Sequence, residues 1–342
     1  MDKKKLIWVV ISILIAGFSI WAVIAQSASF SATDFKAFIV EADERYVAGA
    51  AICTLGFIFF EGMAVRRIAG AIGYKRGITN GTVYGAADVY FSAITPSATG
   101  GQPASAYFMV LDGIPGTATT VILLVNLIMY TLALLFLGGI CCIFRFDIVM
   151  RMALLSKVLI IVGAVILVGL AISFYMLLRR ADVFYKICNG ALHGLEKLHL
   201  LRRGEKIRSK LNATMAEYQE CSRIITGKKA MLVEAFFWNT LQRLSQFFVA
   251  FFVFMAGGQG LKKSVEVLIT QCFVSVGSNC VPIPGAMGVA DYIMLDGYEN
   301  IVGEELGTYM EILARGMSFY ACIVISAIIV VVALCVKKLR RK

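Results

Sequence analysis

Two short stretches rich in proline, glycine and hydroxyl residues interrupt otherwise apolar sequence at residues 95–102 and 282–291. Proline lacks an N–H and disfavours helix in the residue before it, so helices should end at Pro96 and at Pro284. The glycines then let the backbone turn sharply and expose its N–H groups. A new half-helix beginning after each turn would point its positive end inward, which is an anion site suited to a lipid phosphate.

The predicted lipid-headgroup site combines these two breaks with the charged residues nearest to them. Hydroxyl groups of the first break could add hydrogen-bond donors, the acids could hold a cationic headgroup, and Arg243 could hold the phosphate. A structural alternative is that the glycines only permit close packing of helices. The candidates are Asp88, Thr95, Ser97, Thr99, Gly100, Gly101, Gln102, Arg243, Pro284, Gly285, Gly288 and Asp291.

Four further charged residues lie within apolar segments, where charge is costly and usually functional. These secondary candidates are Glu61, Glu234, Glu311 and Arg315. Glu311 and Arg315 are four residues apart on one helix face, so a structural ion pair is an equal alternative for them. Glu61 stands near the end of its apolar segment, where it could also extend to the inner interface.

The composition places the chain among all-α integral membrane proteins. Of its 342 residues 59% are hydrophobic, and the mean hydropathy is +0.80. Soluble domains are closer to half apolar, and a helix needs roughly 20 apolar residues to cross a bilayer. Six segments fulfil this requirement and are predicted to be full spans: residues 6–25, 47–65, 117–144, 154–178, 230–256 and 306–336.

The distribution of charge predicts the orientation, because cytoplasmic segments are enriched in lysine and arginine. Basic residues concentrate in segments 1–5, 66–76 and 337–342 and in the linker 179–229, which has twelve Lys/Arg against five Asp/Glu. The segment 26–46 is richer in acids. Both termini are therefore expected in the cytoplasm, and the net charge of +11 is explained by topology rather than by nucleic-acid binding.

This orientation holds only if each broken region enters and leaves the membrane on one side. We therefore predict two re-entrant helical hairpins, at residues 84–113 and 265–298, within a single polytopic membrane domain that spans 1–342. The halves 6–178 and 230–336 then form an inverted repeat, a layout common among transporters.

No motif for nucleophilic, nucleotide or zinc chemistry occurs, since GxSxG, Walker A and HExxH patterns are all missing from the sequence. The nine cysteines are scattered without a CxxC pair, and the two histidines lie in the basic linker. We therefore expect no catalytic residue, no metal, no cofactor and no disulfide framework.

At residues 95–102 and 282–291 the sequence resembles the lysylphosphatidylglycerol synthase transmembrane region, the flippase-type domain of bacterial multiple-peptide-resistance-factor proteins. The shared pattern is a proline–glycine turn ending in an acid in each half, and the resemblance covers about residues 6–336. Gln102 stands where many relatives have an acid, Ala286 where glycine is common, and Asp291 where glutamate is common.

The resemblance implies a flippase in the bacterial cell membrane that carries an aminoacylated phospholipid such as lysyl-phosphatidylglycerol. Such a carrier lowers surface negative charge and aids resistance to cationic antimicrobial peptides. Another phospholipid or a polyprenyl phosphate is an alternative cargo. A non-transporting partner that docks a separate soluble synthase is a further alternative, and homo-oligomerisation is left open.

The family name also implies phosphatidylglycerol lysyltransferase activity, which transfers lysine from lysyl-tRNA. The longest soluble stretch is the linker 179–229, and the chain ends six residues after its last predicted span. A stretch of that size is too small for an aminoacyl-tRNA-dependent transferase, so we expect no such activity from this chain alone.

Overall fold

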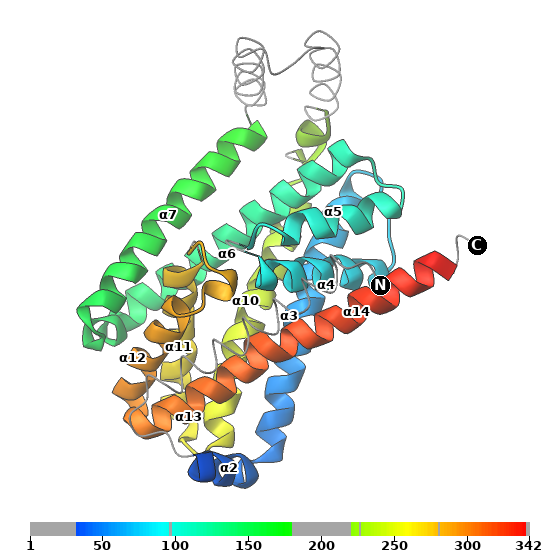
Figure 1. The fold of residues 1–342 in the computed structure, drawn as a ribbon. Helices are drawn as coiled ribbons and strands as arrows, with labels where there is room; N and C mark the ends of the chain where they lie inside the picture. The colour runs from blue at the N-terminus through cyan, green and yellow to red at the C-terminus, as the bar shows by residue number, and fades with distance from the viewer. Residues whose placement is uncertain (1–31, 96–97, 180–219, 226, 280, 340–342) are drawn as a thin grey trace, which may run out of the picture.

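The computed structural model describes residues 32–95, 98–179, 220–225, 227–279 and 281–339, and every regular element in these ranges is a helix (Figure 1). This confirms the all-α prediction for the described part of the chain. The elements are α2 (Ala32–Glu41), α3 (Glu44–Ala71), α4 (Ile78–Ile94), α5 (Gly101–Leu111), α6 (Gly116–Arg151), α7 (Leu154–Arg179), α10 (Lys229–Ala256), α11 (Gly260–Ser278), η2 (Pro284–Ala286), α12 (Val289–Val302), α13 (Glu304–Arg315), η3 (Gly316–Ala321) and α14 (Cys322–Leu339).

Helices α3 and α10 form the antiparallel centre of the fold. At one end the backbone N–H of Asp43 donates to the carbonyl of Ala256 at 3.0 Å, and at the other end Arg67 forms an ion pair with Glu234. The carboxylate of Asp43 also caps the start of α3 by accepting the N–H of Arg45 at 2.9 Å. The remaining helices pack around this pair, as Figure 1 shows.

Helices α4 and α5 form an antiparallel hairpin in which the end of α5 meets the first half of α4. The carboxylate of Asp112, just after α5, accepts hydrogen bonds from Tyr84 at 2.7 Å and from Asn80 at 2.8 Å, both on α4. Its backbone carbonyl accepts from Arg76 at 2.6 Å. The hairpin therefore begins and ends at one level, as a re-entrant element would.

Helices α11 and α12 form the corresponding hairpin in the second half. Tyr298 of α12 is hydrogen-bonded to Gln271 of α11, so these antiparallel helices meet away from the break between them. Gly297 lies so close to α11 that an added Cβ would be 2.4 Å from a methyl carbon of Thr270. Only glycine permits this approach of the two helices.

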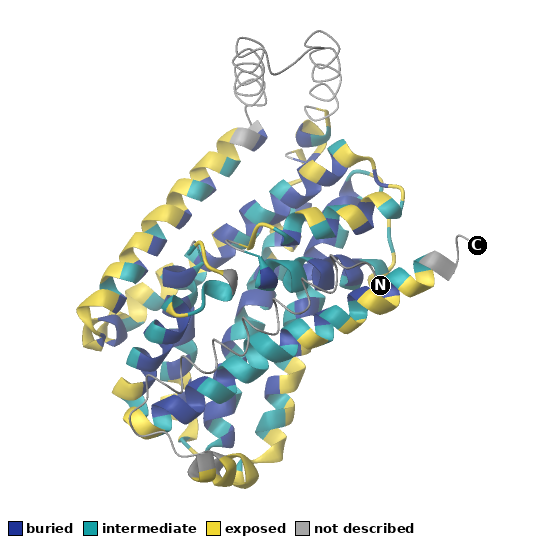
Figure 2. Cartoon of the chain, viewed as in Figure 1, coloured by how far each residue is buried: buried dark blue, intermediate teal, exposed yellow. Residues whose placement is uncertain are grey.

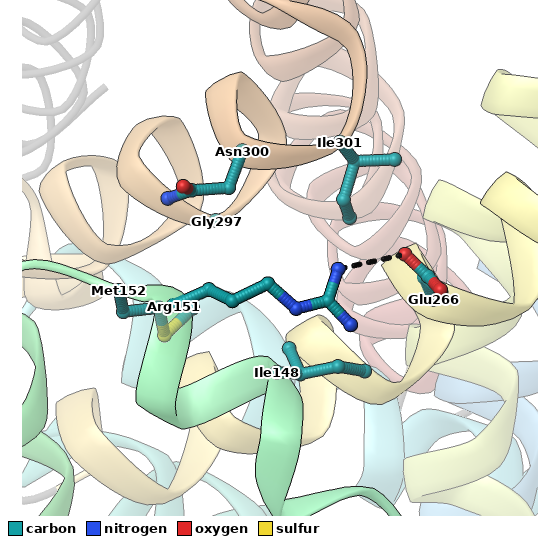
Figure 3. A pocket seen from close by; sticks show the side chains of 7 residues that line it. All are labelled: Ile148, Arg151, Met152, Glu266, Gly297, Asn300 and Ile301. Carbon is teal, nitrogen blue, oxygen red and sulfur yellow. Dashed lines mark ion pairs between the residues drawn. The ribbon is translucent and has the colours of Figure 1, made fainter.

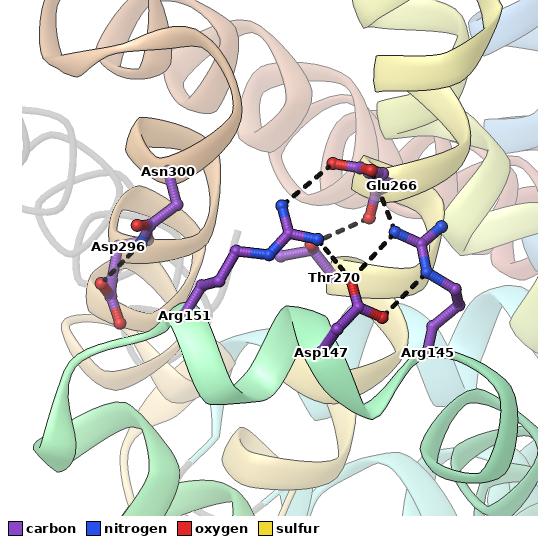
Figure 4. Close-up of polar contacts among 7 residues, drawn as sticks. All are labelled: Arg145, Asp147, Arg151, Glu266, Thr270, Asp296 and Asn300. Atoms are coloured by element: carbon purple, nitrogen blue, oxygen red, sulfur yellow. Dashed lines mark hydrogen bonds and ion pairs between the residues drawn. The ribbon is translucent and has the colours of Figure 1, made fainter.

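The α6–α7 junction (residues 145–153) holds the base of the second hairpin. Backbone geometry within α6 leaves the helical region at Arg145, one residue after the predicted end of the span at 144. Arg145 and Arg151 both form ion pairs with Glu266 of α11, at 2.9 and 3.7 Å (Figure 4). The N–H of Ala153 donates to Asp296 of α12 at 2.9 Å. A space of only about 10 Å³, room for about one water, lies beside Arg151 and Glu266 and faces α12 at Gly297 (Figure 3).

Four segments of the described chain are long and apolar enough to cross a membrane, which confirms the membrane class. They are Glu44–Ala71, Gly116–Arg151, Leu154–Met176 and Glu304–Lys337, and each contains most of one predicted span. Large apolar side chains along α7 are exposed, as a lipid-facing helix requires (Figure 2).

The predicted spans 6–25 and 230–256 are not among these four. The first lies outside the described residues, as do most of the linker 179–229 and the end of the tail 337–342. The second forms α10 but carries Glu234, Arg243 and several amides, which lower its hydropathy. The number of spans and the re-entrant nature of the hairpins therefore stay predictions.

Candidate functional site

A cavity of about 590 Å³ lies between the two hairpin breaks and helices α3, α6, α7 and α10. We call it the central cavity. One wall is polar and charged, whereas α7 contributes an apolar wall formed by Ile166, Leu170 and Phe174. The predicted residues that line it are Glu61, Asp88, Thr99, Gln102, Arg243, Gly285 and Arg315. A cavity of this size that is polar on one side and apolar on the other fits an amphiphile.

Glu61 of α3 and Asp88 of α4, hereafter the acid pair, face the cavity with their carboxyl groups in contact. Glu61 is 2% exposed and accepts a hydrogen bond from Asn126 of α6 at 2.7 Å. The side chain of Gln102 lies 3.5 Å from Asp88. The alternative that Glu61 extends to the interface is wrong, because Asn126 holds it in the interior.

Arg243 of α10 is the cavity cation without a carboxylate partner at ion-pair distance among the residues the structure describes. Its guanidinium donates to Gln246 at 2.9 Å, to Gln242 at 3.2 Å and to the hydroxyl of Tyr130 at 3.3 Å, all neutral groups. It lies 4.4 Å from the centre of the Tyr130 ring. A buried guanidinium held by neutral partners is stabilised by an added anion, and its planar donor set suits phosphate.

The first break is tighter than the sequence predicts. The helix before it ends at Ile94, as expected from Pro96, but the hydroxyl of Thr95 already accepts the N–H of Gly100 at 2.8 Å. An added Cβ on Gly101 would lie 2.2 Å from a carboxylate oxygen of Asp88. Gly101 therefore fits the structural alternative, in which a glycine permits close packing of helices. Its lack of a side chain lets α5 begin directly beside Asp88. Ser97 lies outside the described residues.

The second break is held by internal bonds that occupy Asp291. One carboxylate oxygen of Asp291 accepts the N–H of Gly288 at 2.8 Å, and the other accepts from Arg315 at 2.6 Å. Arg315 also donates to the carbonyl of Gly285 at 2.9 Å. Asp291 thus caps the start of α12 and fixes Arg315, and neither it nor Gly288 lines the cavity. The predicted site residue Pro284 has a side chain outside those that the structure describes.

Two secondary candidates lie away from the cavity. Glu234 stands near the start of α10, about half exposed, in an ion pair with Arg67. Glu311 is completely buried but does not line the cavity. The ion pair that its spacing suggested with Arg315 is absent from the described contacts, because Arg315 pairs with Asp291 instead.

Several polar cavity residues were missed in reading the sequence. Asn126 donates to Glu61 and also accepts from Asn239 at 3.0 Å, while the hydroxyl of Tyr130 donates to Asn279, directly after the end of α11. Their signal was the same as for the charged residues: amides and a hydroxyl within segments that are otherwise apolar. The glutamines on either side of Arg243 gave that signal too.

One comparison with known proteins finds a match. The family model described as "Lysylphosphatidylglycerol synthase TM region" matches residues 9–326. No curated protein and no solved structure matches the chain.

Proposed function

The chain belongs to the lysylphosphatidylglycerol synthase transmembrane-region family, and from this membership and its central cavity we propose that it is a phospholipid translocase. The family supports a lipid-related function in a membrane. The cavity supports a role in holding a headgroup, because it places charged side chains beside an apolar wall inside a bundle of membrane helices.

The proposed cargo is an aminoacylated phospholipid such as lysyl-phosphatidylglycerol, which carries an anionic phosphate and cationic amines on one headgroup. Arg243 would take the phosphate and the acid pair would take an ammonium group. The apolar wall on α7 would accompany the start of the acyl chains. The observation that carries this proposal is the placement of Arg243, held by neutral partners, in one cavity with two contacting carboxyl groups.

The proposed setting is the bacterial cell membrane, with both termini in the cytoplasm and the two hairpins re-entering from opposite sides. Moving such a lipid to the outer leaflet would lower the negative surface charge and aid resistance to cationic antimicrobial peptides. A separate soluble synthase would supply the lipid.

A leaflet-resolved assay in proteoliposomes tests the proposal. The assay compares three labelled lipids: lysyl-phosphatidylglycerol, unmodified phosphatidylglycerol and a polyprenyl phosphate. Each lipid is tested with the parental chain, with Arg243→Gln and with Arg45→Gln, which is a control on an exposed arginine. We expect the chain and the control to move lysyl-phosphatidylglycerol fastest. Preference for another lipid would identify a different cargo, and movement no faster than in protein-free vesicles would refute the translocase.

A further inference from the structure

Glu311 on α13 is a buried acid that the headgroup site does not use. It is 0% exposed, and no donor group in the described part of the chain reaches either of its carboxylate oxygens. The charged groups that act on it are the carboxyl group of Asp291, which it contacts, and the guanidinium of Arg315. A carboxylate buried without a donor is strongly destabilising, so something must neutralise it.

The charges in this cluster leave one carboxyl group without a cation. Among the residues that the structure describes, Arg315 supplies the one guanidinium of this cluster, and it is committed to Asp291 at 2.6 Å and to the carbonyl of Gly285 at 2.9 Å. It also stacks on the ring of Phe319 at 4.7 Å. A proton on Glu311 satisfies the remaining group, because the neutral acid has an O–H that can donate to the Asp291 carboxylate beside it.

We propose that Glu311 is a proton-binding site whose occupancy decides which carboxylate Arg315 pairs with. With the proton bound, Arg315 pairs with Asp291 as observed. When the proton leaves, Glu311 becomes a second carboxylate four residues before Arg315 on one helix, a spacing at which such pairs form. Arg315 then turns to Glu311 and releases both Asp291 and Gly285.

This exchange acts on the second break, because Gly285 and Arg315 both line the central cavity. Releasing Gly285 frees the tip of the second hairpin next to the proposed headgroup site. The helix changes to π geometry at residues 316–321, directly after Arg315, and such segments often mark functional sites. Binding and release of this proton would then be coupled to lipid movement. That coupling rests on the proposed function, whereas the proton site itself does not.

Few other ionisable groups of the described residues lie around Glu311. From α12, Asp291 and Tyr298 face it, and Tyr298 is hydrogen-bonded to Gln271. From its own helix Arg315 faces it. Helix α10 also packs on α13 but contributes no charged group to Glu311 in the ranges that the structure covers.

Infrared spectroscopy of the full chain in lipid nanodiscs tests the proton site without requiring transport. The carbonyl stretch of protonated carboxylic acids near neutral pH should lose one component in Glu311→Gln and be unchanged in Glu304→Gln, an exposed control on the same helix. The difference between the variant and parental spectra separates Glu311 from the acid pair, whose contacting carboxyl groups can add a band of their own. An unchanged band in folded Glu311→Gln would overturn the proposal. Glu311→Asp keeps a titratable group and should keep a shifted band, which guards against a glutamine variant that fails to fold.

Proteoliposomes with a pH gradient test the coupling. The parental rate of lipid movement should change with pH by up to about tenfold per unit, the limit for one proton, whereas Glu311→Gln should move lipid at a rate independent of the gradient. Lipid movement in the parental chain that ignores the gradient would refute the coupling alone. If no lipid moves at all, the proposed function fails, and the infrared band still decides whether Glu311 holds a proton.

Discussion

The ammonium group of Lys337 lies 2.6 Å from a carboxylate oxygen of Asp112, which ties the end of α14 to the base of the first hairpin. The second hairpin is held in a comparable way, since Glu266 at its base pairs with Arg145 and Arg151 of the α6–α7 junction. Each hairpin is thus bound at its base by charged groups from the other half of the chain. These contacts therefore join the two halves at the bases of the hairpins.

The contact at Asp112 predicts a loss of stability in acid. Burial alone would raise the pKa of Asp112, but the hydrogen bonds from Lys337, Tyr84 and Asn80 outweigh it and hold that pKa below its ordinary value. A lowered folded-state pKa stabilises the fold above the unfolded-state value of about 3.9, and this contribution is lost as the pH falls through the folded-state value.

Thermal unfolding in detergent between pH 7 and pH 3 measures this contribution. At pH 7 we expect Asp112→Asn to be less stable than the parental chain by about 1 kcal/mol. Because asparagine has no carboxyl group to protonate, the difference should shrink in acid. A constant difference across the range would show that Asp112 acts through shape and not through charge.

The acid pair should determine the preference for cationic headgroups. Asp88→Asn and Glu61→Gln remove charge but keep shape and polar contacts. A charge-assisted contact contributes roughly 1.5–3 kcal/mol, so movement of lysyl-phosphatidylglycerol should fall on the order of 10- to 100-fold. Movement of unmodified phosphatidylglycerol should change little. An equal loss for both lipids would mean that the pair supports the fold and does not select the headgroup.

Arg243 should matter for every lipid that carries a phosphate. Arg243→Gln removes the cation and should slow all such lipids, while Arg243→Lys keeps the charge but loses the planar donor set that reaches Gln246 and Gln242. The lysine variant should therefore be intermediate. The measurement is the initial rate for each lipid, and a lysine variant equal to the parental chain would show that charge alone suffices.

The positions of the two breaks could be predicted from sequence because proline and glycine act locally. Helix α4 ends at Ile94 beside Pro96, and α5 and α12 begin at Gly101 and Val289. Helix α11 ends at Ser278, earlier than Pro284 suggested, because Pro282 already disfavours helix before it.

The conformations inside the breaks were less predictable. Glycine was expected to supply the tight backbone, yet Ala98 and Ala286 also adopt left-handed φ angles, 54° and 51°. Such a conformation is disfavoured for alanine and persists only where surrounding contacts hold it. Local propensity could not show this, because those contacts come from the packed helices.

The partners of the charged residues could not be read from the sequence. Arg315 was equally compatible with Glu311, four residues away, and only the packing of α12 on α13 gives it to Asp291, 24 residues away. Glu61 is likewise fixed by Asn126, 65 residues later. Helical spacing predicts which residues share a face but does not predict which face of another helix lies opposite.

The two hairpins should each begin and end on one side of the membrane, and cysteine labelling in intact cells can test this. Single cysteines replace Ile78 and Gly116 around the first hairpin, and Leu261 and Glu304 around the second, in a background without native cysteines. All four positions are exposed, so the substitutions should not disturb packing. We expect membrane-impermeant reagent added outside to label positions 261 and 304 only, because the basic segments place 78 and 116 inside. Labelling of all four after permeabilisation is the control. If the two members of either pair were labelled from opposite sides, that hairpin would cross the membrane, and the inverted repeat with two re-entrant elements would have to be abandoned.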